Sequence, residues 1–492
     1  MKRTLLRGRP LFVAGAGLCL SAFFGCSDGA KVTVTPVPTA TDAGLDAPTT
    51  PIEEEKDAGV DAEVPYQGPA PYDGGPMAPL GVLDLGAVAA DAPVSFEVPA
   101  GTLGFHVMVT STSASESLAV RSVQAPSGAF FMQNATPTGG DHPTSETLIG
   151  TTATAQVPQN AFSGESVEAG TWKVVFTGGT GMRGKIQLQT TPDGVFHGGI
   201  LNLNVYLPGG LTLGSGKSIS AAAAWARPEV KDRITAFFAA IYELYGLRNG
   251  TVRFFDVPAK YLSVSDQELG TLFKETKVAP QGQALNIFLS EVDDQSAWWG
   301  VAAGIPGAAN TPGNDQSGLA LASVPQAPPE MEGYVLAHEA GHFLGLNHTT
   351  EFQGGIADPL PDTPRCTTID DGNLEACPDF TNIMFPSGAA QAPVVSSAFQ
   401  RRVIHGSPIF RAFTTGTAAA FAGRTTAFDY GRLFGHPGVA LSRAERLVLA
   451  GSCGNARPVV RDADRVELAR ISGGLRGVAR RLLARSALRD AP

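Results

Sequence analysis

The chain has 492 residues, with 46 acidic and 36 basic side chains, a formal net charge of −10, 58 glycines and 36 prolines. This length allows two or three domains with cores of their own, and the glycines and prolines predict many turns and a linker. The overall acidity argues against nucleic acid as the main partner, because nucleic-acid binding relies on an excess of positive charge.

Residues 1–26 have the features of a signal peptide. Basic residues precede an apolar run over 11–25 that is too short to span a bilayer comfortably. The run ends at Cys26 in a segment that resembles a bacterial lipoprotein cleavage box, in which Cys26 would be acylated. Leu is usual where Phe23 stands, so plain secretion is the alternative. Either route predicts an extracytoplasmic protein, which is secreted or held at the outer membrane or cell surface by a lipid anchor.

Residues 27–75 are rich in Pro, Thr, Ala, Asp and Glu, and they include the run Glu53-Glu54-Glu55. Such a composition cannot bury a core, so this stretch predicts a disordered linker.

Residues 76–193 show an all-β pattern. Apolar residues alternate at 94–98 and 105–109, and Trp172 lies in another strand-like run between turn-forming residues. The pattern predicts a small β-sandwich accessory domain. His106 lies among strand residues and is expected to be a packing or surface histidine. Binding of substrate or glycan by this domain is left open.

Residues 194–415 change to alternating elements. The helix predicted at 228–245 begins at a proline and ends before Gly246. A capping box at Ser265–Glu268 predicts a second helix to about residue 276. We expect strands at 200–207, 252–257, 285–291 and 318–324, a third helix from residue 330, and a fourth near 397–405. The expected order before the fourth helix is β-α-β-α-β-β-α.

The third helix carries the pattern H-E-x-x-H-x-x-G-x-x-H. His338 and His342 are four residues apart, so they lie one turn apart on one helix face. Gly345 permits the positive φ that ends the helix, and His348 then supplies a third nitrogen. Glu339 lies beside the first histidine without being needed as a ligand. Three protein ligands with one open position are typical of a catalytic zinc site, whereas a chance match would be a solvated helix face.

The extended motif resembles that of the metzincin clan of zinc endopeptidases, whose other hallmark is a methionine-containing turn beneath the metal. Met384, in the segment 382–388, is the candidate for that turn. The segment between His348 and this turn is similar to the pappalysin branch, and the resemblance covers about residues 195–410. That branch often has a tyrosine two residues after the methionine, but Pro386 stands there, so the tyrosine's role is not expected.

The resemblance implies a metzincin-like α+β catalytic domain in which Leu319–Ser323, the strand before the third helix, lies at the cleft edge and pairs with an extended substrate. It implies that His338, His342 and His348 bind Zn²⁺ and that Glu339 is the general base for a zinc-bound water. The expected function is that of a zinc endopeptidase acting on proteins or peptides. The alternative is a cell-surface binding lipoprotein with a catalytically weak metzincin scaffold, against which the presence of Glu339 argues.

The loop between the third histidine and Met384 contains two cysteines and several acidic residues. Cys366 and Cys377 would form a disulfide in an oxidising compartment, and two unpaired buried thiols are the alternative. Pappalysin-like enzymes use calcium nearby, so the acidic residues could bind Ca²⁺ or simply be solvated. These residues are Asp358, Asp362, Asp370 and Asp371.

Residues 416–492 are rich in arginine and predict a helical C-terminal region. An Arg-rich helix of this kind is a solvated or packed surface helix, or it contacts a membrane or an acidic polymer. Otherwise membrane contact is expected only through the lipid anchor.

Overall fold

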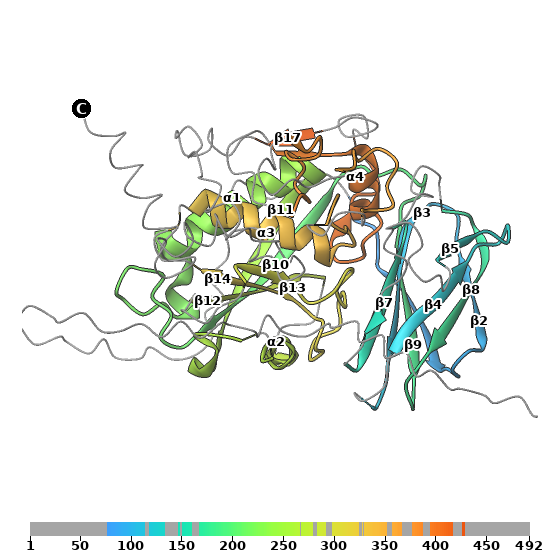
Figure 1. The fold of residues 1–492 in the computed structure, drawn as a ribbon, viewed down its shortest axis with the longest axis horizontal. Helices are drawn as coiled ribbons and strands as arrows, with labels where there is room; N and C mark the ends of the chain where they lie inside the picture. Colours follow the sequence, from blue (N-terminus) through green and yellow to red (C-terminus); the bar gives the residue numbers. More distant parts are fainter. Residues whose placement is uncertain are drawn as a thin grey trace, which may run out of the picture. The chain divides into compact units, whose positions relative to one another are not determined.

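A computed structural model of the chain describes most of residues 76–416, together with 426–428. It shows a mixed α/β, sheet-rich protein with few helices (Figure 1). None of the helices among the described residues is long and apolar enough to cross a membrane. The proposed signal peptide with Cys26, the linker at 27–75 and nearly all of 416–492 lie outside the described residues. Internal segments outside the description are 114–117, 133–145, 148–149, 160–166, 266, 279–282, 292–297, 324–326, 328, 352–356, 367–375, 387–393 and 417–425.

The first part of the described chain forms two antiparallel sheets, which we call the two-sheet region. One sheet has the strand order β1-β9-β3-β7, and the other has the order β2-β8-β4-β5 with β6 paired to β4. The strands are β1 (Gly81–Ala87), β2 (Pro93–Val98), β3 (Thr102–Thr110), β4 (Leu118–Gln124), β5 (Phe130–Met132), β6 (Glu146–Thr147), β7 (Thr152–Val157), β8 (Gly170–Thr177) and β9 (Arg183–Thr190).

Alternate residues of both sheets supply one apolar core in the two-sheet region. Trp172 on β8 is fully buried and packs edge-on against Phe105 of β3, with ring centroids 4.9 Å apart. The predicted alternation at 105–109 is confirmed, because Phe105, Val107 and Val109 all enter this core. The intervening His106 is also buried, so it is a packing histidine rather than a surface one.

The second part of the described chain is built on a mixed sheet, which we call the mixed-sheet region. Its strand order is β11-β10-β12-β14-β13, and β16 also pairs with β10. The strands are β10 (Gly199–Pro208), β11 (Leu247–Val257), β12 (Leu285–Glu291), β13 (Gly300–Ala302), β14 (Leu319–Ser323) and β16 (Arg411–Ala412), with β15 (Val394–Ser396) and β17 (Thr426–Phe428) forming a separate pair.

Two helices of this region, α1 and α4, begin and end where the local sequence signals lie. The prediction for α1 (Pro228–Tyr245) is confirmed, and Gly246 ends it with a φ of 74°. α4 (Ala398–His405) opens with a complete capping box formed by Ser397 and Gln400. The second predicted helix is shorter than expected. The Glu268 carboxylate accepts a hydrogen bond from the backbone N–H of Ser265, but α2 spans only Leu269–Phe273 before the 3₁₀ turn η4 (Lys274–Val278). Two further 3₁₀ turns are η2 (Ala221–Ala226) and η3 (Ala259–Tyr261).

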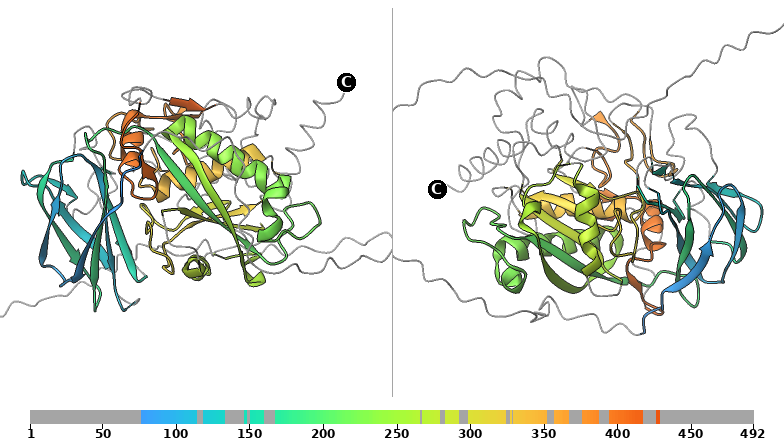
Figure 2. Two further views of the ribbon diagram at one scale, coloured as in Figure 1. Left: turned by 180° about the vertical axis from the view of Figure 1, so that it is seen from behind. Right: turned by 90° about the horizontal axis from the view of Figure 1, so that it is seen from below.

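Helices α1 and α3 (Pro329–Phe343) lie side by side over the mixed sheet (Figures 1 and 2). Gly333 allows this close approach, because a Cβ there would lie 2.5 Å from the Cβ of Ala236. A buried ion pair joins Arg233 of α1 to Glu332 of α3, and Ser323 at the end of β14 donates a hydrogen bond to the same carboxylate. The position of α3 is therefore fixed against both a helix and a strand.

The prediction that Leu319–Ser323 lies at the cleft edge is wrong. This strand, β14, is flanked by β12 on one side and by β13 on the other. Among the described strands, the antiparallel strand β13 ends the sheet instead. β13 has only three residues, Gly300–Ala302, which is too short for a period of two to be visible in the sequence.

Candidate metal centre

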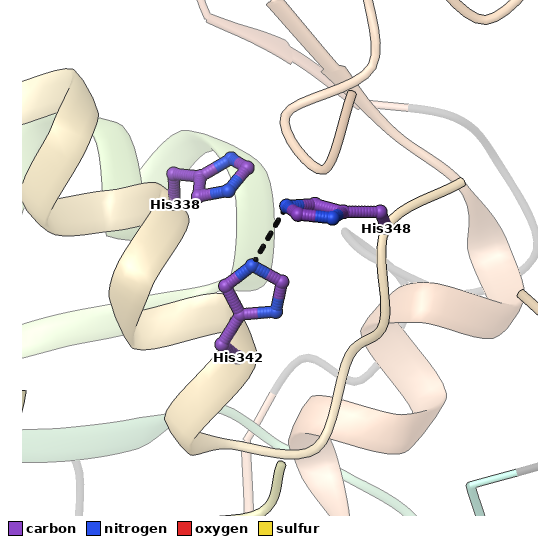
Figure 3. A group of neighbouring side chains, drawn as sticks. All are labelled: His338, His342 and His348. Atoms are coloured by element: carbon purple, nitrogen blue, oxygen red, sulfur yellow. Dashed lines mark hydrogen bonds between the residues drawn. The ribbon is translucent and has the colours of Figure 1, made fainter. Parts of the chain in front are cut away.

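The end of α3 and the turn after it bring three histidines together (Figure 3). His338 and His342 project from one face of the helix, and His348 faces them from the segment that follows. One ring nitrogen from each lies within 4.8 Å of the others, and all three residues are buried. The chain reverses at Gly345, whose φ of +108° lies in the region that favours glycine.

Each of these imidazoles has its Nδ1 atom occupied by a protein acceptor. The Nδ1 atom of His338 lies 2.6 Å from the carbonyl oxygen of Ile383, and that of His342 lies 2.7 Å from the carbonyl oxygen of Leu346. The Nδ1 atom of His348 lies 2.9 Å from a carboxylate oxygen of Glu351. Carbonyl and carboxylate oxygens only accept hydrogen bonds, so each Nδ1 atom carries the proton. In this tautomer Nε2 is the ring nitrogen that can bind a metal.

The chemistry of this donor set fits a metal ion. The Nε2 atoms of His342 and His348 are 3.1 Å apart. This spacing is close to the distance of about 3.3 Å between two imidazole nitrogens bound to a tetrahedral zinc. Burial and the neighbouring His348 lower the pKa of His338 to about 3, so this ring is neutral at ordinary pH. The buried triad can therefore hold a metal ion.

Glu339 lies between α3 and the strand at the end of the sheet. Its side chain is buried, and a Cβ added at Gly300 of β13 would lie 2.8 Å from its Oε1 atom and 2.6 Å from Val335. The glycine thus leaves room for the carboxylate beside the first residue of β13. A carboxylate in this place can accept a proton next to the three histidines.

The turn that contains Met384 packs against the back of the helix. Met384 is fully buried, and a Cβ at Gly341 would lie 2.5 Å from its sulfur atom. The Asn382 side chain accepts a hydrogen bond from the backbone N–H of Met384 and so shapes the turn. The same turn supplies the Ile383 carbonyl that holds His338, and the Met384 carbonyl accepts from the N–H of Thr349, next to His348. The Met384 turn is therefore bonded to both ends of the histidine motif.

The loop with the cysteines and acidic residues is only partly described. Cys366 and Cys377 form a disulfide with an S–S distance of 1.99 Å. Burial raises the pKa of Asp358 to about 8. Asp362 accepts hydrogen bonds from Ser397 and from the N–H of Phe399, so both its carboxylate oxygens are used at the start of α4. The other two acidic residues of the expected calcium site, Asp370 and Asp371, lie outside the described residues, and calcium stays a prediction.

Four residues that shape this centre are not predicted from the sequence. Glu351 orients His348, Gly300 makes room for Glu339, and Gly341 makes room for Met384. The fourth, Gln156 of β7, donates hydrogen bonds to the carbonyls of Leu344 and Val403. The position of Glu351, three residues after the last histidine, was a signal available in the sequence. The two glycines and Gln156 depend on contacts distant in the chain.

Comparisons with known proteins identify no family for this chain. No protein-family model and no curated protein matches it. Among solved structures, the protein YxiM from Bacillus subtilis is similar to it at 14% identity, over 41% of this chain and 46% of the other, with a TM-score of 0.13. The match thus spans less than half the length of that protein, and at this TM-score it carries no argument about fold or function.

Proposed function

We propose that this protein is a zinc-dependent endopeptidase of the metzincin type, similar to the pappalysin branch. The observation that carries the proposal is the convergence of three buried imidazoles whose Nδ1 atoms are all held by oxygen acceptors. Three nitrogen ligands leave a fourth position for chemistry, which distinguishes catalytic from structural zinc sites. The buried carboxylate of Glu339 supports the same reaction class.

In the proposed hydrolysis of a peptide bond, the histidines and Glu339 have different roles. Zn²⁺ held by His338, His342 and His348 would supply Lewis-acid stabilisation of the negative charge that develops on a scissile carbonyl oxygen. Glu339 accepts the proton of the attacking water and then passes it to the leaving amine. The hydrogen bonds to the Nδ1 atoms keep the three imidazoles correctly oriented throughout.

An extended substrate would pair with β13. Among the described strands, β13 pairs with β14 and ends the sheet, and its first residue, Gly300, lies against Glu339. A peptide added beyond β13 would gain backbone hydrogen bonds whatever its sequence, and side-chain pockets would give the specificity. This pairing would bring one peptide bond close to the general base.

The proposal extends to the organisation of the chain. In it, the two-sheet region is a β-sandwich accessory domain and the mixed-sheet region is the metzincin-like catalytic domain. We place the protein outside the cytoplasm, anchored through Cys26 or secreted. The disulfide between Cys366 and Cys377 supports this location, because disulfides persist in oxidising compartments.

The test compares the wild-type protein with Glu339→Ala on an unbiased peptide mixture, with bound zinc measured in both. We expect both to hold zinc, because Glu339 is not a metal ligand. Only the wild type should cut efficiently, because Glu339→Ala removes the general base and lowers the rate of cleavage by about 10²–10⁴-fold. The cut sites then give the specificity. If both proteins bind zinc and neither cuts, the endopeptidase proposal fails and the alternative of a binding lipoprotein is favoured. If neither binds zinc, the metal centre itself is refuted.

A further inference from the structure

A polar face of the two-sheet region is buried rather than exposed to solvent. In the sheet register, His106 of β3 pairs with Gln156 of β7 on one side and with Gln187 of β9 on the other. Thr154 and Gln189 lie on the same face, two residues along their strands. We call these five residues the docking face. Each is at most 2% exposed, and each has a backbone carbonyl as a hydrogen-bond partner.

The docking face bonds to backbone carbonyls of the mixed-sheet region. His106 lies 3.0 Å from the carbonyl oxygen of Gly307, and Thr154 donates to that of Pro306, in the segment that joins β13 to β14. Gln187 donates to Ala309 in the same segment. The docking face thus adds hydrogen-bond partners to backbone carbonyls of the mixed-sheet region, of which those of Gly307 and Ala309 also accept from within that region. The two regions are therefore joined by specific bonds as well as by contact.

Gln156 makes the bonds that lie closest to the candidate metal centre. Its Nε2 atom donates to the carbonyl of Leu344, 2.9 Å away, and to that of Val403, 2.7 Å away. Carbonyls at the end of a helix lack a partner within the helix, so Gln156 serves the C-terminal ends of both α3 and α4. Leu344 lies between His342 and the turn that delivers His348.

The turn itself is shaped to receive the Gln156 amide. A Cβ at Gly345 would lie 3.1 Å from the Nε2 atom of Gln156. Gly345 thus serves both the positive φ of the turn and the close approach of the amide. A side chain that contacts this turn can fix the angle at which the chain leaves α3 and hence the position of His348.

We propose that Gln156 is a positioning residue for the metal centre, so that the accessory two-sheet region also helps to shape the site. This inference rests on the proposed function in taking the three histidines as metal ligands. Gln156 touches none of them and acts through the turn at 344–346.

The docking face offers a matched control in Gln189. This residue is also a buried glutamine, and its Nε2 atom also donates to two carbonyls of the mixed-sheet region, those of Ser407 and Phe410. These carbonyls follow α4 and are not part of the histidine turn. Gln156→Met and Gln189→Met each replace an amide by an apolar side chain of similar length, so both remove two donated hydrogen bonds.

The experiment measures two properties of the full-length wild type and of both variants. The first is zinc affinity, by competition with a chromophoric chelator. The second is hydrogen exchange of the metal-free protein in the peptide covering 344–348. We expect Gln156→Met to bind zinc about tenfold more weakly than wild type, with faster exchange in this peptide, as for other residues that orient metal ligands. Gln189→Met should match wild type in both.

Equal changes in the two variants would overturn the proposal, since the effect would then reflect general loss of stability. Wild-type values for Gln156→Met in both measurements would overturn it as well. If the wild type binds no zinc, the proposed function fails, and the exchange comparison still decides whether Gln156 fixes the turn. Should Gln156→Met not fold, Gln156→Asn takes its place, because the shorter side chain keeps the amide but cannot reach both carbonyls.

Discussion

The two-sheet region and the mixed-sheet region each bury a histidine, and the difference between the two residues shows what makes a ligand. His106 of β3 and His338 of α3 are both buried, and burial lowers the pKa of His106 to about 4 and that of His338 to about 3. Each has one ring nitrogen on a backbone carbonyl. The other nitrogen of His106 has no hydrogen-bond partner among the described residues, whereas His338 shares its site with two further imidazoles. The two histidines differ in having other imidazoles beside them, and they do not differ in burial.

Removing each histidine in turn tests this difference most directly. We expect His338→Ala to weaken zinc binding by more than about 100-fold, because losing a ligand costs more than losing a residue that orients one. His106→Ala should leave zinc affinity unchanged and lower the free energy of unfolding by about 1–3 kcal/mol, through loss of a buried hydrogen bond. Chelator competition and thermal unfolding measure the two effects. Equal zinc loss in both variants would refute the distinction.

A second prediction concerns the space beside the base. Gly300→Ala would place a methyl group within 2.8 Å of Glu339 and Val335, so the carboxylate must move. We expect kcat/KM for peptide cleavage to fall by about 10–100-fold, because small displacements of catalytic groups are costly, while bound zinc stays constant. Steady-state kinetics and metal analysis of the same samples check this. Unchanged kinetics would show that Glu339 is not held by the end of β13.

A third prediction concerns the groups that accept hydrogen bonds from the Nδ1 atoms of the histidines. Glu351→Ala removes the carboxylate that accepts from His348, leaving that ring free to rotate. Zinc affinity should fall by about tenfold, as is usual when such an outer partner of a ligand is lost. Glu351→Gln keeps an oxygen acceptor and should recover most of the affinity. A Gln variant as weak as the Ala variant would show that charge, and not orientation, is what Glu351 supplies.

The sequence predicted most of the centre because its signals are local. His338, His342 and His348 fall within one helix and the turn after it, and α1 carries its start and stop signals in Pro228 and Gly246. The edge strand was missed because Gly300–Ala302 is too short to show a period.

The docking face was missed for a different reason. Gln156 and Gln187 alternate with apolar residues, a pattern that normally indicates a solvent-exposed face. Their partners are backbone carbonyls more than 100 residues away, as the separations of 188 and 122 residues show. No pattern in the sequence reports such a contact. The uncharged amides of Gln156, Gln187 and Gln189, on the two strands that flank β3, were the only available hint.

The smallest expected effect is on the pH dependence of stability. Burial lowers the pKa of His106 in the folded protein, so the unfolded chain takes up a proton at this residue below pH 6.5 while the fold resists it. The contribution of His106 is thus fully present above pH 6.5 and is lost as the pH falls toward 4. Between pH 6.5 and 5.5 the loss is about 1 kcal/mol. Denaturant unfolding of wild type and His106→Gln should show a shallower pH dependence in the variant; parallel curves would contradict this.

X-ray absorption at the zinc edge on the purified wild-type protein tests the central claim most directly. We expect about one zinc per chain, with three imidazole nitrogens at about 2.0–2.1 Å and one further light-atom ligand. We also expect His348→Ala to lose this spectrum. A protein without zinc, a zinc bound by sulfur, or a spectrum unchanged in His348→Ala would contradict the account.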